Sequence, residues 1–285
     1  MAGNLTIDAL LARGVLRLRD ALAPETATLN LDAELLLAHA LSMSRAQLKT
    51  HPESIPSEER ASVFANLIER RAAGEPVAYI LGYRDFWTLR LGVNPSVLVP
   101  RPETELLVER ALAVGAPGAA RVADLGTGSG AIALALASER PEWSITATDI
   151  SEAALATALA NATRLNLERV EFLSGSWFEP LTDRRFDLIV SNPPYVAEND
   201  AALLDPALQR EPATALTAGP DGLASLRWIA HSAPQYLERR GWLLLEHGSD
   251  QAAAVARELV VRGFRHVRCV PDVAGLPRVT EAQWV

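Results

Sequence analysis

The stretch RVADLGTGSGAIALALASER, residues 121–140, decides the fold, because it predicts a strand, a glycine loop and a helix in immediate succession. The apolar run RVADL is typical of a buried strand, and AIALALAS is typical of a buried helix. Gly126, Gly128 and Gly130 let the chain turn sharply between them and leave backbone N–H groups open to a ligand. We therefore expect a β-α unit of a parallel sheet, with a ligand site at the carboxyl ends of its strands.

Strands and helices are predicted to alternate along residues 100–285. Segments typical of strands begin at residues 121, 143, 170, 186, 241, 264 and 278. One of the helices between them is predicted over residues 222–238. The alternation predicts an α/β domain with a doubly wound, Rossmann-like sheet. The last two predicted strands, FRHVRCV and RVTEAQWV, follow each other without a helix, so we expect the last strand to run antiparallel.

Residues 1–82 are predicted to form a small helical domain. Apolar residues recur at spacings of three and four in three segments, residues 7–22, 30–43 and 57–74, which is typical of amphipathic helices packed in a bundle. Asn30 and Ser57 are residue types that cap helices, so we expect them to mark the starts of the second and third helix.

Residues 83–99 predict a β-hairpin that links two domains. The segment YRDFWTLRL alternates and is rich in aromatic residues, and GVNPS has the composition of a turn. Phe86 and Trp87 are expected to pack within the hairpin, with the border of a pocket as the alternative. The expected division is thus a helical domain over residues 1–82, the hairpin linker, and the α/β domain over residues 100–285.

The composition predicts a globular protein whose partner is a protein or a small molecule. Hydrophobic residues make up 49% of the 285 residues, enough for a large core. The formal net charge is −8, whereas a protein that grips a phosphate backbone usually presents a basic face. We expect no direct contact with nucleic acid or membrane, and we expect a monomer.

Cysteine and histidine usage argues against disulfides and metal sites. Cys269 is the only cysteine, which fits a reducing compartment, and it is predicted to be a buried strand thiol. The five histidines show no spacing such as H-x-x-x-H, so we expect no metal. The sequence shows neither the roughly 18 apolar residues of a membrane span nor a basic secretory start. A cytoplasmic location is therefore expected.

The second strand of the α/β domain ends in ATDIS, which places Asp149 at the expected ligand edge. Asp149 follows Gly126 by 23 residues, close to the roughly 20 at which an acidic side chain reaches a ribose hydroxyl. The alternative is a helix cap, formed by Asp149 or by Ser151. We favour ribose binding for Asp149 and assign the cap to Ser151.

Two more strand ends carry candidate site residues. The third strand runs into SGSWFEP, where Trp177 could stack on an adenine ring or could be an ordinary rim aromatic. The fourth strand runs into SNPPY, residues 191–195. Its two prolines stop any ladder and stiffen the chain, so this stretch alone also fits a simple rigid turn.

The order of these motifs resembles a known enzyme family. DLGTGSG, an acid after the second strand and NPPY after the fourth are similar to Rossmann-like methyltransferases that use S-adenosyl-L-methionine. LVPRPETE, FDLIVSNPPY, EPATALTAGPDGL and LLLEHG resemble, within these, the release factor glutamine methyltransferases, the PrmC/HemK family. The resemblance covers most of residues 75–285, and the N-terminal helices agree with that family's substrate-recognition domain.

The resemblance implies roles for individual residues. It implies that the substrate is the glutamine of a Gly-Gly-Gln motif in peptide chain release factors. It implies that Asn192 and Pro193 hold the glutamine amide as the catalytic pair, with Asn192 also near the cofactor, while Pro194 and Tyr195 shape the substrate slot. It further implies a cofactor site made of Gly126, Thr127, Gly128, Ser129, Gly130, Asp149 and Trp177.

Elementary chemistry explains why such a site needs acceptors. An amide nitrogen is a poor nucleophile, so the enzyme's task is orientation. If the Asn192 side-chain oxygen and the Pro193 carbonyl each accept one N–H, the nitrogen is fixed facing the methyl group. Both acceptors bind more strongly as the nitrogen becomes positive. Glu103 and Glu246 are left between a role in positioning this site and ordinary roles at a helix start and a strand end.

Three other functions remain open from the residues themselves. N-P-P-Y also occurs in methyltransferases that act on adenine N6 or guanine N2, although the acidic net charge argues against a nucleic-acid substrate. Gly126, Gly128 and Ala131 satisfy G-x-G-x-x-A, so an NAD-dependent oxidoreductase is possible, but it leaves NPPY unexplained. In a non-catalytic binding module NPPY would be only a turn.

Overall fold

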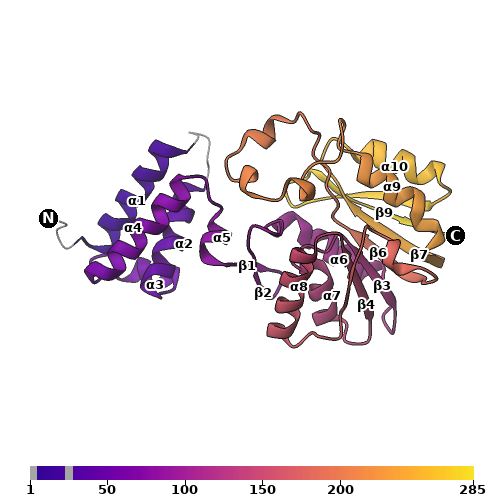
Figure 1. Ribbon diagram of the computed structural model, residues 1–285, viewed down its shortest axis with the longest axis horizontal. Helices are drawn as coiled ribbons and strands as arrows, with labels where there is room; N and C mark the ends of the chain where they lie inside the picture. Colours follow the sequence, from indigo (N-terminus) through magenta and orange to yellow (C-terminus); the bar gives the residue numbers. More distant parts are fainter. Residues whose placement is uncertain (1–4, 23–27) are drawn as a thin grey trace. The chain divides into compact units, whose positions relative to one another are not determined.

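A computed structural model describes residues 5–22 and 28–285 (Figure 1). The chain divides into two compact units. The first comprises Met1–Gly82 and Leu204–Arg210, and the second comprises Tyr83–Leu203 and Glu211–Val285. The hairpin thus belongs to the second unit, and a short segment beyond SNPPY belongs to the first. Nothing in the sequence pattern pointed to this segment.

The first unit is helical, as its apolar periodicity predicts. Its elements are α1 (Ile7–Ala21), α2 (Leu29–Leu41), α3 (Arg45–Thr50), α4 (Glu58–Ala72) and α5 (Val77–Leu81). Ser57 caps α4 by accepting from the Arg60 N–H, as predicted. The predicted cap at Asn30 is wrong: α2 begins one residue earlier and its N-cap is Thr28.

The two short helices α3 and α5 were not predicted, because neither is long enough to show a period. α3 is stabilised at its start by a capping box, in which the Gln47 N–H donates to Ser44 Oγ and the Ser44 N–H donates to Gln47 Oε1. Gly82, with φ of +78°, ends α5.

One core and one buried ion pair stabilise the first unit. Its fully buried leucines include Leu18, Leu36 and Leu37. Arg71 Nε donates to Asp32 Oδ2 over 2.8 Å, and both side chains are almost wholly buried. The segment Leu204–Arg210 joins this unit through the Arg210 guanidinium, which donates to the Ala73 carbonyl over 3.2 Å.

The aromatic residues of the hairpin have packing roles. Strands β1 (Tyr83–Phe86) and β2 (Leu89–Gly92) pair antiparallel, and Phe86 is only 1% exposed. The Trp87 indole N–H donates to Glu139 Oε1 over 2.7 Å. These contacts support the packing interpretation of Phe86 and Trp87.

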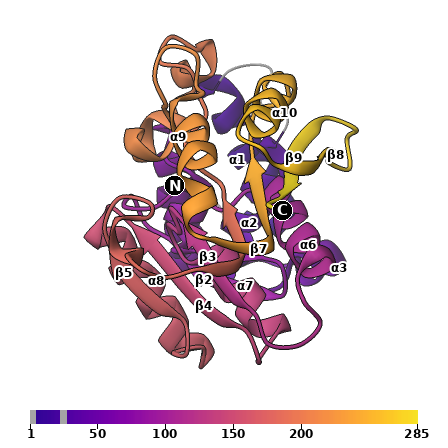
Figure 2. The ribbon, with the colours of Figure 1, turned by 90° about the vertical axis from the view of Figure 1, so that its right-hand side faces the viewer.

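The second unit contains the predicted α/β sheet. Its seven strands lie in the order β5-β4-β3-β6-β7-β9-β8. The strands are β3 (Arg121–Leu125), β4 (Ser144–Asp149), β5 (Glu171–Ser174), β6 (Phe186–Ser191), β7 (Leu237–Glu246), β8 (Arg265–Pro271) and β9 (Pro277–Gln283). β9 runs antiparallel to β7 and β8, which confirms the prediction for the last strand. The edge strands β5 and β8 lie on opposite sides of the sheet in Figure 2.

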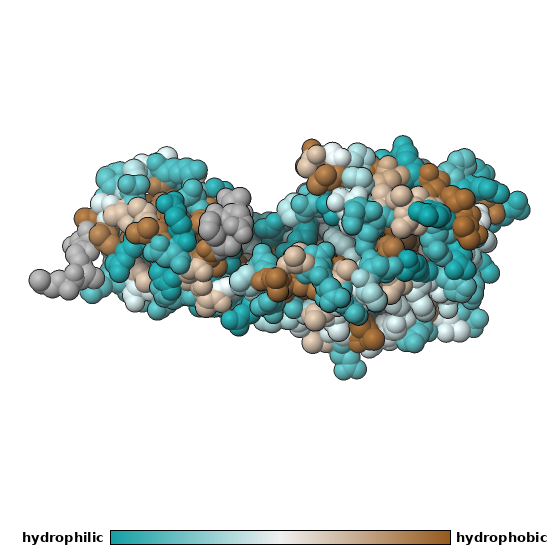
Figure 3. Space-filling view, turned by 90° about the horizontal axis from the view of Figure 1, so that it is seen from above, coloured by the Kyte–Doolittle hydropathy of each residue, from teal (hydrophilic) through white to brown (hydrophobic). Residues whose placement is uncertain are grey.

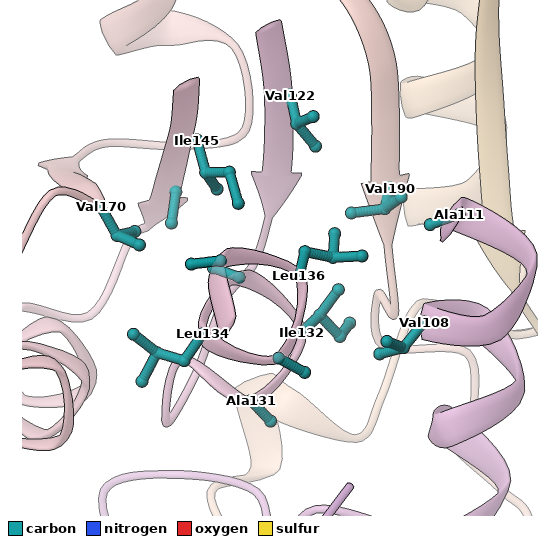
Figure 4. Packing of buried hydrophobic residues seen from close by; sticks show 14 of the residues in the cluster. Val108, Ala111, Val122, Ala131, Ile132, Leu134, Leu136, Ile145, Val170 and Val190 are labelled. Carbon is teal, nitrogen blue, oxygen red and sulfur yellow. The ribbon is translucent and has the colours of Figure 1, made fainter. Parts of the chain in front are cut away.

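Helices cover both faces of this sheet (Figure 1). One face carries α6 (Glu105–Val114), preceded by the 3-10 turn Pro102–Thr104, together with α7 (Ala131–Glu139) and α8 (Glu152–Leu165). The other carries α9 (Ala224–Ser232) and α10 (Ala252–Val261). Figure 4 shows α7 between the strand residues Val122 and Ile145 on one side, toward which Leu136 points, and Val108 of α6 on another, toward which Ile132 points. The apolar run of residues 131–137 in α7 is buried at every position.

Three details of the α/β domain differ from the sequence prediction. The helix predicted over residues 222–238 is wrong in its second half, because Pro234 cannot continue it and α9 ends at Ser232. Strand β7 begins earlier than predicted, at Leu237. Cys269 lies on β8 as predicted, but it is only partly buried because β8 is an edge strand.

The surface seen in Figure 3 is mainly hydrophilic, with small hydrophobic patches between polar residues. Within residues 5–22 and 28–285, no helix is long and apolar enough to cross a membrane.

Candidate active site

A cavity of about 480 Å³ lies in the second unit, next to the ends of several strands. Eight predicted site residues line it: Gly126, Thr127, Gly128, Ser129, Asp149, Trp177, Asn192 and Pro194. Gly130, Pro193 and Tyr195 are not among the lining residues. A second cavity, of about 250 Å³, lies between α9 and α10 and contains none of the predicted residues. The strand-end cavity is therefore the candidate site.

The three glycines of the loop serve different purposes. All have positive φ, at +73° for Gly126, +57° for Gly128 and +84° for Gly130. A Cβ at Gly126 would lie 3.1 Å from the Trp177 ring, whereas one at Gly128 would meet nothing within 4 Å. Gly128 therefore leaves bare backbone beside the cavity. Gly130 instead packs against Leu134 and is the N-cap of α7, which explains its place outside the cavity.

Asp149 connects the glycine loop to the second strand. Its Oδ2 accepts from the Gly128 N–H over 2.8 Å, and its Oδ1 accepts from the Ser151 N–H over 2.9 Å. Each carboxylate oxygen keeps acceptor capacity for a hydroxyl group, because one hydrogen bond does not exhaust its lone pairs. Ser151 is the N-cap of α8 and accepts from the Ala154 N–H, so the assignment of the cap to Ser151 is confirmed.

Trp177 lines the same cavity as Asp149. Its backbone has a φ of +50°, which is uncommon for a bulky residue, and Thr148 donates a hydrogen bond to its carbonyl over 2.9 Å. The ring lies over Gly126 and 6.5 Å from the ring centre of Trp228. An aromatic face held in this way can stack on a flat ligand.

SNPPY continues from β6 into a segment fixed by side-chain hydrogen bonds. Asn192 Nδ2 donates to Thr104 Oγ1 over 3.1 Å, and the Tyr195 hydroxyl donates to Glu246 Oε1 over 3.3 Å. Burial and the nearby carboxylate of Glu246 raise the pKa of Tyr195, so the hydroxyl stays protonated. The stiff turn is thus a wall of the cavity at Asn192 and Pro194, with Tyr195 directed to Glu246.

Two ionisable residues that the sequence analysis did not single out fix the remaining wall. Glu211 is buried, and its carboxylate accepts from Arg101 Nη2 over 2.6 Å and from the Val99 N–H over 3.1 Å. These bonds hold residues 212–217 and 96–101, which both contribute to the lining. The motifs LVPRPETE and EPATALTAGPDGL contain the pair, but nothing in their spacing shows that they meet.

Buried carboxyl groups surround the site. Burial raises the pKa of Asp124 to about 7, although hydrogen bonds from the Thr127 hydroxyl and the Ala133 N–H oppose the rise. Burial also raises the pKa of Glu246 to about 7, and Thr104, Arg278 and Tyr195 oppose it. Asp124 could have been suspected from its place directly before the glycine loop. Glu103 is exposed and does not line the cavity.

In the part of the chain that the structure describes, no group of three or more His, Cys, Asp or Glu side chains is arranged to hold a metal ion.

Comparison with known proteins identifies the family. Residues 9–82 match the PrmC N-terminal domain, and residues 102–219 match the Methyltransferase small domain. A release factor glutamine methyltransferase of Pseudomonas aeruginosa is 51% identical over 267 residues, covering 94% of this chain and 97% of that protein. One of Aliivibrio fischeri is 45% identical over 99% of both chains. This chain belongs to the release factor glutamine methyltransferase family.

Two solved methyltransferase structures are similar to this chain in fold. The catalytic domain of human METTL16, in complex with the MAT2A 3′UTR hairpin 6, has a TM-score of 0.59 and 21% identity, over 77% of this chain and 81% of that one. The Thermus thermophilus 16S rRNA N2 G1207 methyltransferase, with AdoMet and guanosine, has a TM-score of 0.52 and 19% identity, over 71% and 50%. These likenesses show a Rossmann-like methyltransferase fold.

Two glycines in one loop of this family member allow a matched test of how SNPPY is held. A Cβ at Gly222 would lie 2.2 Å from the Tyr195 carbonyl oxygen, whereas one at Gly219 would approach nothing closer than 3.5 Å. Both have positive φ, near +70°. We expect Gly219→Ala to cost about 1–2 kcal/mol of backbone strain. Gly222→Ala should cost about 1–3 kcal/mol more, from the overpacking. Thermal unfolding measures both, and equal losses would contradict a tight contact at Tyr195.

The buried carboxyl of Asp124 predicts a pH dependence of stability. Its pKa is about 7 in the folded chain, above the roughly 3.9 of an unfolded Asp, so folding favours the protonated form. The stability that protonated Asp124 contributes is therefore fully present below about pH 4 and is lost as the pH rises through 7. We expect Asp124→Asn to gain stability relative to the unsubstituted chain between pH 5 and pH 8, measured by denaturant unfolding. A difference that stays constant over this interval would refute the assignment.

Proposed function

We propose that this chain transfers a methyl group from S-adenosyl-L-methionine to the side-chain amide nitrogen, N5, of the glutamine in the Gly-Gly-Gln motif of a peptide chain release factor. One observation carries the proposal: in a member of this family, a single cavity brings Gly128, Asp149 and Trp177 together with Asn192 of SNPPY. A carboxylate that can bind ribose, an aromatic ring that can stack on adenine and an amide that can bind the substrate therefore line the same cavity.

The residues present fit the cofactor. Ser129 Oγ and Asp124 Oδ1 are buried beside the glycine loop without a hydrogen-bond partner among the described residues, so polar capacity remains there. Gly128 leaves room for close approach, Asp149 can accept from ribose hydroxyls, and Trp177 offers a face for adenine. When bound, the sulfonium supplies a methyl group that is already activated, so the chain itself needs only to bind and orient.

Asn192 and Pro193 would hold the substrate amide. Asn192 Oδ1 and the Pro193 carbonyl each accept one N–H, which points the remaining face of the nitrogen at the methyl group. Both acceptors would bind more strongly as positive charge develops on the nitrogen during methyl transfer, so they would stabilise the transition state. The nitrogen then loses a proton to water. Pro194 and Tyr195 shape the slot, Pro194 in the cavity wall and Tyr195 from behind it.

The partner, location and organisation follow from the same proposal. The helical unit around residues 5–82 would recognise the release factor, the hairpin of residues 83–99 would link it to the catalytic domain of residues 100–285, and the enzyme would act as a monomer in the cytoplasm. The acidic net charge of −8 supports a protein substrate over a nucleic acid.

Methyl transfer to purified release factor, compared with transfer to ribosomal RNA and DNA, tests the substrate. We expect label in the release factor alone, and mass spectrometry of the Gly-Gly-Gln peptide should place it on the glutamine. A release factor whose glutamine is replaced by alanine is the matched control. Label found only in nucleic acid would refute the proposal.

Exchanging single site residues separates substrate from cofactor binding. Asn192→Ala should keep most of the affinity for S-adenosylhomocysteine and lose about 2–4 kcal/mol of transition-state stabilisation, because it removes one oriented acceptor. Asp149→Ala should instead weaken S-adenosylhomocysteine binding, because the ribose hydroxyls lose their acceptor. Calorimetry and kcat/KM measure the two effects. Equal loss of cofactor affinity in both variants would contradict this division of roles.

A further inference from the structure

Asn192 is the first of three polar side chains that follow one another from the cavity into the protein, and of these Asn192 and Thr104 line the cavity. Asn192 Nδ2 donates to Thr104 Oγ1, and the Thr104 hydroxyl in turn faces the buried carboxyl of Glu246. Thr104 is 3% exposed and Glu246 is fully buried. The three residues come from distant parts of the chain: the start of α6, the end of β7 and SNPPY.

The carboxyl of Glu246 has an acceptor to spare. Its Oε1 accepts from the Tyr195 hydroxyl, whereas its Oε2 is buried and has no hydrogen-bond partner among the described residues. Such an unpaired oxygen is costly, so it draws the nearby hydroxyl proton of Thr104 toward itself. Burial raises the pKa of Glu246 to about 7, while the Thr104 hydroxyl, the positive charge of Arg278 and the Tyr195 hydroxyl oppose the rise and favour the ionised, accepting form.

The direction of this proton decides the orientation of the Asn192 amide. A threonine hydroxyl has one proton and two lone pairs. When its proton points to Glu246, it can only accept from Asn192, so Nδ2 must turn toward Thr104 and Oδ1 away from it. The reverse orientation would place an NH₂ group against the N–H groups of a substrate amide, donor against donor.

We infer that Thr104 and Glu246 are positioning residues that hold Asn192 with its oxygen, rather than its nitrogen, toward the substrate amide. This inference rests on the proposed function, in which Asn192 Oδ1 is an acceptor for the glutamine nitrogen. It extends that function to Thr104, which contacts Asn192, and to Glu246, which acts on Asn192 through Thr104.

Two substitutions at Thr104 test the inference with matched volume and matched chemistry. Thr104→Val keeps the shape but has no hydroxyl, so the Asn192 amide is free to reverse. We expect kcat on release factor to fall roughly 10- to 100-fold, as when the outer partners of active-site groups are removed, with S-adenosylhomocysteine affinity within about twofold. Thr104→Ser keeps the hydroxyl and should recover most of the loss. Equal kcat for Thr104→Val and the unsubstituted enzyme would overturn the inference.

A double-mutant cycle distinguishes positioning from a general structural role. If Thr104 acts through Asn192, Thr104→Val should cause no further loss of kcat in an Asn192→Ala background. Independent effects would instead add, and an additive result would refute the positioning role.

An NMR measurement that does not depend on catalysis tests this inference independently of the proposed function. In ¹⁵N-labelled protein, the side-chain amide signal that disappears in Asn192→Ala belongs to Asn192. Thr104→Val should shift this signal and speed its hydrogen exchange, whereas Thr104→Ser should leave both nearly unchanged. An unshifted signal would overturn the inference whatever the assays show. Absence of methyl transfer by the unsubstituted enzyme, with the shift present, would refute the proposed function alone.

Discussion

The parallel pairing of β3 with β4 on one side and β6 on the other is the constraint on which the site depends. Leu125, the last residue of β3, lies opposite Thr148 of β4 and Ser191 of β6. This register brings the glycine loop, Asp149 and Asn192 to the same edge of the sheet, where the three strands end. Because a one-residue slip would turn every side chain to the other face, the buried apolar pattern of the strands also fixes the site.

Buried carboxyl groups are the second structural theme, and each one supports a different wall. Asp124 holds Thr127 of the glycine loop, Glu211 joins the segments around Val99 and residue 212, and Glu246 lies behind SNPPY. Burying such groups costs free energy unless they are paired. The fold thus gives up stability around the cavity to hold backbone and amide groups in fixed directions, which suits an enzyme whose task is orientation.

Family membership and the contacts in the structure are independent grounds for the proposed function, and they agree. Family likeness supplies the glutamine substrate, which no spacing in the chain reveals. The described contacts supply what likeness leaves open, such as the hydrogen bond from Asn192 to Thr104 and the place of Tyr195 beside Glu246 rather than in the cavity wall.

The sequence by itself determined the α/β class, the antiparallel last strand, the helical N-terminal region and eight of the residues that line the cavity. It could do so because strand ends, glycine loops and apolar periods are local signals. Only the tertiary structure decided that Arg101 meets Glu211, that Thr104 and Glu246 lie behind Asn192, and that Leu204–Arg210 joins the N-terminal unit. These partners are far apart in the chain, and no local pattern records which buried charge or hydroxyl faces another.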